Sequence, residues 1–291
     1  MKKYSIYMLY SLRPKQWIKN LFIFLPLFFG NKLLVFPDNL NTLYAFLVFS
    51  LAASSVYLMN DIIDLEQDRL HPIKRLRPIA SGIIKQRDAL FAALFLGILS
   101  ITFAFKLNLY FGCIIVIYFV FTAAYSFVLK KIVLLDVFCL GGFFLLRVIS
   151  GSLAADVPLS QWIIIITTLL ALFLGFNKRR QELALLGNKT NYTRSVLDKY
   201  NLYFIDQMIV IITASLLIAY MLYTVDAGPH IELGRDKLIF TIPFVYYGIF
   251  RYLYLIHINK YSGDPTLMLF SDKMSQLNIV LWFVVCLLII Y

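Results

Sequence analysis

Long apolar segments alternate with short polar ones along the whole 291-residue chain. A helix needs roughly 20 apolar residues to cross about 30 Å of hydrocarbon, so the shorter runs must extend into their flanks. Because backbone amides in lipid must be bonded within their own segment, we predict nine membrane-spanning helices and no strands. The nine runs are Leu21–Phe36, Leu40–Met59, Ala89–Phe105, Leu107–Leu129, Ile132–Leu153, Trp162–Phe176, Met208–Val225, Leu238–Ile258 and Leu277–Tyr291.

Composition and charge support a membrane protein of fixed orientation. The chain is 61% hydrophobic and 15% charged, against about 25% charged residues in soluble domains. Alternate polar segments carry 21 Lys and Arg residues, whereas the segments between them carry 4. This bias places the N-terminus and the richer segments in the cytoplasm, and the protein in a cell (plasma or inner) membrane. The net charge of +11 is then explained by topology, without a nucleic-acid partner.

The organisation along the chain predicts one domain. No low-complexity linker interrupts residues 1–291. The polar loops 60–88 and 178–206 each hold 29 residues, and each follows a predicted span on the cytoplasmic side. Paired helical repeats of this kind are typical of membrane proteins that bind a ligand in a central cavity. We therefore expect an all-α, polytopic protein with nine helices around a cavity; a homo-oligomer is compatible with the sequence.

The first polar loop opens with an acidic cluster. Asp61, Asp64 and Asp68 are spaced i, i+3, i+7, which places them on one face of a helix with Asn60 at its edge. Hard carboxylate oxygens are ligands for Mg²⁺, which also takes substrate phosphates. The alternative is an ordinary solvated loop. Aligned carboxylates gain little at the mouth of a membrane helix unless they bind something, so we favour a magnesium site formed by these four residues.

Basic residues follow the acids and recur in the second loop. Arg69, His71, Lys74, Arg75 and Arg77 lie around Pro72 and before Pro78, which restrict the backbone. They suit the binding of phosphates, although part of them also serves as topological signal. At the end of the sixth predicted span, Lys178 and Arg179 share a helical face with Glu182. Spacing alone favours a surface ion pair here, and phosphate binding is the alternative.

Further polar residues lie at or near predicted helix ends. The segment Arg13-Pro14-Lys15-Gln16-Trp17-Ile18-Lys19-Asn20 precedes the first span. Arg147 and Arg251 fall within spans, where a charge is costly and usually faces a polar cavity or a partner. The remaining candidates for substrate binding are Lys15, Gln16, Lys19, Asn20, Tyr125, Lys130 and Arg251.

The run from Asn60 to Gly82 resembles the first signature of the UbiA superfamily of intramembrane prenyltransferases, NDxxDxxxD followed by RPIxxG. The nine predicted spans and the two motif loops are similar to that superfamily over nearly the whole chain. Typical members join a prenyl diphosphate to an aromatic acceptor and carry a second acidic motif, DxxxD. This chain departs from it, because Lys178 stands at the first acidic position and only Glu182 keeps a carboxylate.

The basic second motif resembles that of one branch of the superfamily, the decaprenyl-phosphate phosphoribosyltransferases. The segments RPKQWIKN and NKRRQEL, and the runs around Arg251 and Asp272, are similar to the same branch. The resemblance implies Mg²⁺-dependent, inverting transfer of 5-phosphoribose from phosphoribosyl diphosphate to a polyprenyl phosphate. It gives Asp61, Asp64, Lys178 and Glu182 catalytic roles and the other candidates substrate binding. The alternatives are a conventional prenyltransferase and a transporter or lipid-binding protein. Gly- and Pro-broken spans at mid-membrane would favour the transporter, whereas the charged motifs here lie at cytosolic helix ends.

Overall fold

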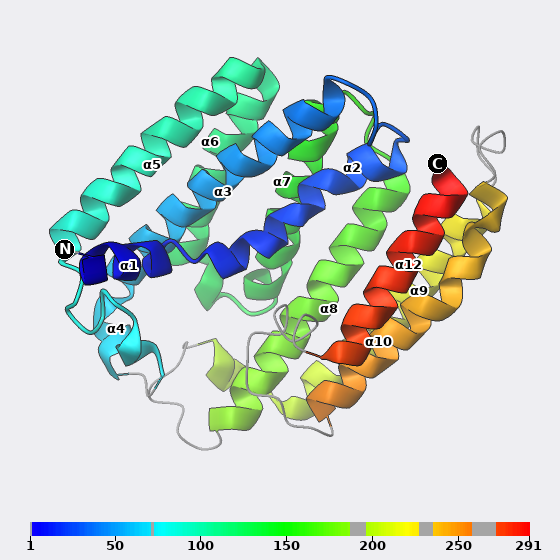
Figure 1. Ribbon diagram of the computed structural model, residues 1–291. Coiled ribbons are helices and arrows are strands. Elements are labelled where there is room, and N and C mark those ends of the chain that lie inside the picture. The colour runs from blue at the N-terminus through cyan, green and yellow to red at the C-terminus, as the bar shows by residue number, and fades with distance from the viewer. Residues whose placement is uncertain (1, 71–72, 187–195, 227–234, 258–271) are drawn as a thin grey trace. The chain divides into compact units, whose positions relative to one another are not determined.

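The computed structural model describes residues 2–70, 73–186, 196–226, 235–257 and 272–291, and within these ranges every regular element is a helix (Figure 1). Eight helices in these ranges are long and apolar enough to cross a membrane, and they confirm the all-α membrane architecture. They match eight of the nine predicted spans, with boundaries that extend into the polar flanks. The eight are Asp38–Ile63, Gln86–Leu107, Leu109–Lys131, Leu135–Ala155, Gln161–Ala184, Leu202–Val225, Lys237–His257 and Lys273–Ile290.

The first predicted span, Leu21–Phe36, has a different structure. A 3-10 helix, η1 (Pro14–Ile23), leads directly into the short helix α2 (Phe24–Phe29), which ends at Gly30. Neither piece has the length of a membrane span. Pro26 lies inside α2 and has no N–H to donate, which explains why a regular α-helix does not continue through this apolar run.

The chain forms two compact units. The first comprises Met1–Cys139, Phe143–Leu159 and Lys189–Val196, and the second comprises Leu140–Gly142, Ser160–Asn188 and Leu197–Tyr291. The first unit contains the acidic cluster and the second contains the basic motif of the second loop. The prediction of a single domain is not tested by this division.

Helix α3 (Asp38–Ile63) is the centre of the first unit. It contacts α1 (Lys2–Ser11), η1, α2, α4 (Leu65–Leu70), α5 (Gln86–Leu107) and α6 (Leu109–Phe127). Small residues allow this close packing, as is usual between membrane helices. Those buried along α3 include Ala45, Ser50, Ala52, Ala53, Ser54 and Ser55.

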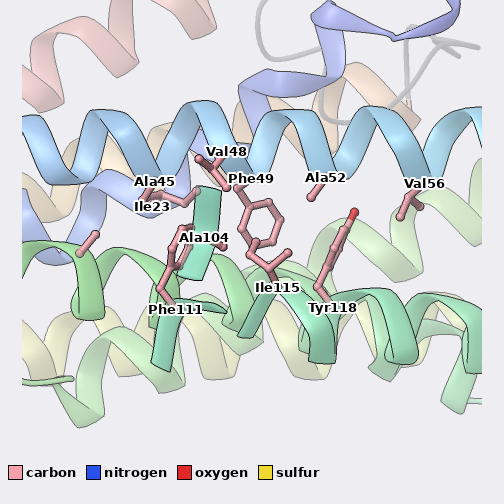
Figure 2. Packing of buried hydrophobic residues seen from close by; sticks show 11 residues of the cluster. Ile23, Ala45, Val48, Phe49, Ala52, Val56, Ala104, Phe111, Ile115 and Tyr118 are labelled. Carbon is pink, nitrogen blue, oxygen red and sulfur yellow. The ribbon is translucent and has the colours of Figure 1, made fainter. Parts of the chain in front are cut away.

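The apolar core of the first unit lies where α3 faces α5 and α6 (Figure 2). Phe49 of α3 is fully buried and its ring packs against Tyr118 of α6, with 4.8 Å between centroids. Asn108 joins α5 to α6 as a single connecting residue and caps α6 by accepting a hydrogen bond from Phe111 N at 2.7 Å. This tight connection keeps α5 and α6 antiparallel. Helix α7 (Leu135–Ala155) adds Ala154 to the same cluster.

The second unit is built from α8 (Gln161–Leu186), α9 (Leu202–Val225), the 3-10 helix η7 (Arg235–Thr241), α10 (Ile242–His257) and α12 (Lys273–Ile290). Helix α9 packs on α8 and α10, and α10 packs on α12. Tyr220 of α9 ties three elements together. Its hydroxyl lies 2.6 Å from Thr241 Oγ1 and accepts a hydrogen bond from Trp282 Nε1 at 3.0 Å.

Candidate functional site

The acidic cluster lies at the junction of α3 and α4 rather than on one continuous helix. Asp61 is in the last turn of α3, Asp64 is its C-cap, and Asp68 is in α4. A helix-type hydrogen bond connects the two sides of the junction, since Asp68 N donates to Asp64 O at 2.8 Å. The predicted alignment of the three acids on one face of a helix is therefore only approximate.

Two of the acids converge on the same cation. Arg77 Nη1 donates to Asp61 Oδ1 at 3.0 Å and to Asp68 Oδ2 at 2.5 Å. Arg13 Nη2 also donates to Asp61 Oδ1. Both carboxylates are buried, with 3% and 2% of Asp61 and Asp68 exposed. A buried carboxylate requires compensation, and these guanidinium groups supply it.

Asp64 and the neighbouring amide of Asn60 are bound by residues at the end of α6 and in the 3-10 helix that follows it. Lys130 Nζ, in the 3-10 helix η3 (Leu129–Lys131), donates to Asp64 Oδ1 at 3.0 Å. Ser126 Oγ donates to Asn60 Oδ1 at 2.9 Å. On the same helical turn, Tyr125 packs its ring edge-on against Phe143, with 5.6 Å between centroids. The structure thus brings Ser126 to Asn60 and Lys130 to Asp64, residues that are far apart in the sequence.

The donors of the acidic cluster fit a magnesium ion that is completed by other ligands. Among the described residues no three side chains of His, Cys, Asp or Glu are close enough to hold a metal by themselves. Mg²⁺ does not need such a cage, because it usually takes one or two carboxylates together with waters and phosphate oxygens. The oxygens of Asp61 and Asp68 that share Arg77 already surround one positive group. The assignment of the metal to these residues stays a prediction.

The other basic residues of the first loop are less enclosed. Arg69 is exposed and pairs with exposed Glu66 at 3.0 Å, and Arg75 is exposed in the 3-10 helix η2 (Lys74–Leu76). Lys74 of η2 is half-buried. The predicted role of His71 lies outside the described residues. From this basic group, Arg77 contacts Asp61 and Asp68 directly.

The N-terminal motif runs along α3. Asn20 is fully buried; its amide nitrogen donates to Ser50 Oγ at 2.9 Å, and its oxygen accepts from Arg147 Nε at 2.8 Å. Arg147 is also buried and lies against the rings of Phe49, Tyr118 and Phe144. Asn20 and Arg147 therefore form a structural contact that joins η1 to α7. Of the other motif candidates, Lys15 is exposed, and Gln16 and Lys19 are half-buried.

A groove of about 330 Å³ lies between α3, α5 and α6. Asn60 and Ser126 line one part of it, and the remaining walls are mainly apolar, with Gly97 and Phe119 among them. The hydroxyl groups of Ser55 and Thr122 are turned to backbone acceptors; Ser55 Oγ, for example, donates to Ala93 O at 2.7 Å. The groove therefore presents an apolar surface that begins next to the acidic cluster.

The basic motif of the second unit is held by ion pairs within that unit. Arg179 is buried on α8 and pairs with Glu182 one turn later, as the spacing predicts. Arg180 pairs with Asp206 of α9 at 2.5 Å. Lys178 is half-buried beside them. This part of α8 therefore concentrates three cations against two acids.

Arg251 has a carboxylate partner in the second unit. Its guanidinium donates to Asp272 Oδ1 at 2.9 Å and to Oδ2 at 3.2 Å, and Asp272 also accepts from Ser275 N at the start of α12. The hydrogen bond from Arg251 is the main cause that lowers the pKa of Asp272 to about 2. This pair favours the structural alternative for Arg251, which ties α10 to α12.

Arg13 and Ser126 contact the acidic cluster and were not among the residues predicted for it. Arg13 is the first residue of the RPKQWIKN motif, so the signal was present, but its pairing with Asp61 spans 48 positions. Ser126 carries no signal in sequence, because one serine in an apolar helix is ordinary. Both are found only through the packing of η1 and α6 on α3.

Comparison with protein families matches residues 22–274 to the UbiA prenyltransferase family. Among curated relatives, the decaprenyl-phosphate phosphoribosyltransferase of Mycobacterium tuberculosis is 30% identical over 277 residues, covering 94% of this chain and 90% of that protein. The enzyme of the same name from Mycolicibacterium smegmatis is 29% identical over 286 residues, covering 94% and 88%. The similarity thus extends over nearly the full length of both chains.

Solved structures have the same fold. A UbiA homologue from Archaeoglobus fulgidus bound to DMAPP and Mg²⁺ matches with a TM-score of 0.69 at 19% identity, covering 96% of this chain and 98% of that one. Digeranylgeranylglyceryl phosphate synthase matches with a TM-score of 0.65 at 20% identity, covering 99% and 97%. These likenesses establish the architecture.

Proposed function

Because the chain belongs to the UbiA prenyltransferase family of membrane-embedded transferases, we propose that it transfers 5-phosphoribose from phosphoribosyl diphosphate to a polyprenyl phosphate, with release of diphosphate. The observation that carries this proposal is the basic second motif. Lys178 lies on α8 at the first acidic position of the DxxxD motif that the resemblance implies, Arg179 and Arg180 follow it, and only Glu182 keeps a carboxylate. Cations suit a donor and an acceptor that each bring an additional phosphate. The names of the full-length relatives agree with this reaction.

The acidic cluster is proposed to hold the diphosphate of the donor through Mg²⁺. Asn60, Asp61, Asp64 and Asp68 would hold the ion, which would supply positive charge against the departing diphosphate. Arg77 and Lys130 contact these acids and can turn to phosphate oxygens. Such groups stabilise the leaving group and position the ribose.

The acceptor lipid is proposed to lie in the apolar groove between α3, α5 and α6. The groove begins at Asn60, so a chain in it would place its phosphate next to the acidic cluster. Its volume is near the lower end of the range of about 300–1,000 Å³ for small-molecule sites, which suits part of a long chain. The rest of the chain would remain in the bilayer, on the cytoplasmic half that the charge pattern assigns to the site.

The reaction needs no strong general base, because a phosphate monoester is already ionised at neutral pH. The bond from C1 of the ribose to the diphosphate oxygen breaks with its electrons going to diphosphate. A phosphate oxygen of the lipid forms the new bond to C1 from the opposite face. Lys178 and Arg179 are proposed to bind the phosphates of the substrates during this exchange.

The direct test is an assay with purified protein, Mg²⁺, labelled phosphoribosyl diphosphate and a series of polyprenyl phosphates. We expect label in the extracted lipid, and none when a chelator removes Mg²⁺. The competing function is prenyl transfer from a prenyl diphosphate to an aromatic acceptor, which the resemblance to typical superfamily members implies. Product from that pair, and none from the phosphoribosyl donor, would replace the proposal.

The stereochemistry of the product gives a second prediction. One displacement inverts the anomeric carbon, whereas two displacements retain it. The α-configured donor should therefore give a β-configured lipid-linked phosphoribose. Proton and phosphorus couplings at C1 of the extracted product measure this. An α product would mean a double displacement or a front-face attack, and the assignment of Asp61 and Asp64 solely to the metal would be abandoned.

The second motif can be tested through Lys178. Losing one charge-assisted contact to a phosphate typically lowers binding by about 1.5–3 kcal/mol, so Lys178→Ala should raise the KM of the donor or of the lipid roughly ten- to a hundredfold. Lys199→Ala is the matched control, because Lys199 is an exposed lysine of the same unit. Equal KM values for the two variants would exclude a phosphate contact at Lys178.

A further inference from the structure

Arg13 has an unusual position at the start of η1. Its backbone is in the left-handed region, with φ of 54° and ψ of 56°, and this directs the chain into the 3-10 helix. Its guanidinium donates to Asp61 Oδ1 and lies 5.1 Å from the centroid of the Tyr57 ring. Asp61 is 3% exposed, so Arg13 reaches a carboxylate that solvent hardly touches.

A row of polar contacts fixes η1 along α3 behind Arg13. Trp17 Nε1 donates to Ser54 Oγ at 3.0 Å, and Asn20 Nδ2 donates to Ser50 Oγ at 2.9 Å. Ser50, Ser54 and Asp61 lie on one side of α3, with spacings of four and seven residues. The guanidinium is therefore held at the acidic end of this row rather than reaching it by chance.

The two guanidinium groups paired with Asp61 differ in the partners that remain to them when a cation binds Asp61. Arg77 also pairs with Asp68 at 2.5 Å, so it retains a partner. Among the described carboxylates, Arg13 is paired with Asp61. A divalent cation that binds Asp61 Oδ1 competes for the same oxygen and leaves Arg13 without its ion pair.

We propose that Arg13 couples the binding of the divalent cation to the binding of diphosphate; this inference rests on the metal site of the proposed function. A cation alone must displace Arg13 from Asp61, which weakens its binding. When diphosphate arrives with the cation, the displaced guanidinium gains a phosphate oxygen in place of the carboxylate. Cation and diphosphate then bind together more tightly than either alone, and the coupling is reciprocal.

The test is a titration with Mn²⁺, followed by electron paramagnetic resonance, with and without methylenediphosphonate. Arg13→Ala should bind Mn²⁺ alone about tenfold more tightly than wild type, because a competing charge has been removed. The same variant should lose most of the enhancement that methylenediphosphonate gives to wild type. Since each titration contains the same Mn²⁺–diphosphonate complex in solution, differences between variants report on the protein.

Two variants separate this role from other effects. Arg87→Ala removes an equal charge from an exposed position in the first turn of α5, and should change neither quantity. Arg13→Lys keeps the charge and should restore most of the coupling, which a merely destabilised Arg13→Ala protein would not explain. Gel filtration in detergent checks that each variant is monodisperse.

The outcomes are distinct. Tighter Mn²⁺ binding and lost enhancement in Arg13→Ala alone support the coupling. Unchanged Mn²⁺ affinity in Arg13→Ala, with normal binding by wild type, would overturn this inference and leave the metal site intact. Absence of Mn²⁺ binding by wild type, with and without the diphosphonate, would overturn the metal assignment and this inference with it.

Discussion

Asp61→Asn is expected to lower turnover by about a hundredfold or more while the protein still folds and inserts. The substitution keeps the size of a side chain that is 3% exposed and removes the charge on which two guanidiniums and the proposed Mg²⁺ depend. Asp64→Asn should have the same effect, since Asp64 lies at the same helix end. Initial rates with labelled phosphoribosyl diphosphate at saturating Mg²⁺ provide the measurement.

Glu66→Gln is the matched control for this prediction. It makes the same chemical change in the same loop, but Glu66 is exposed and its partner is Arg69. Surface ion pairs contribute little, so turnover should stay near wild type. If Asp61→Asn and Asp64→Asn both kept near-normal rates, the acids would be structural partners of Arg13, Arg77 and Lys130 only, and the proposed metal site would be abandoned.

Among glycine-to-alanine substitutions in the helices of the first unit, Gly151→Ala is expected to lower the stability of the protein most. A Cβ at Gly151 in α7 would lie 1.9 Å from Ile23 O and 2.7 Å from Ile23 C, and backbone atoms cannot rotate away. To accept it, η1 must move off α7, which breaks the hydrogen bond between Asn20 and Arg147. Overpacking typically costs about 1–3 kcal/mol, and the lost contact adds to this cost.

Thermal unfolding in detergent measures the effect, and Gly141→Ala is the control on the same helix. A Cβ at Gly141 has nothing within 4 Å. Alanine is favoured over glycine in a helix by about 1 kcal/mol, so Gly141→Ala should be neutral or slightly stabilising. An equal midpoint for the two variants would mean that η1 does not pack on α7 at Gly151.

Hydrophobic runs were sufficient to predict eight of the membrane helices, because the length and apolarity that a bilayer demands are local properties. They failed at Leu21–Phe36, where the end of η1 and the short helix α2 with Pro26 stand in place of one long helix. The reason is that the average hydrophobicity of a segment takes no account of the backbone hydrogen bond that a proline removes.

The candidate site was predictable in its residues and less so in its pairings. Asp61, Asp64, Asp68 and Arg77 lie within one short stretch of sequence, so their position in the same loop could be predicted. The pairs of Asp61 with Arg13 and of Asp64 with Lys130 join positions 48 and 66 residues apart. They depend on which faces of η1 and α6 turn toward α3, and that is decided by packing over the whole first unit.

The burial of Arg147 has a consequence for how the protein is made. A lone arginine near the middle of a helix makes insertion into the bilayer unfavourable by about 2.5–3.5 kcal/mol. The groups that solvate it, Asn20 and the rings of Phe49 and Tyr118, belong to segments that are synthesised before α7. We therefore expect that the groups which solvate Arg147 are already present in the nascent chain when α7 is inserted.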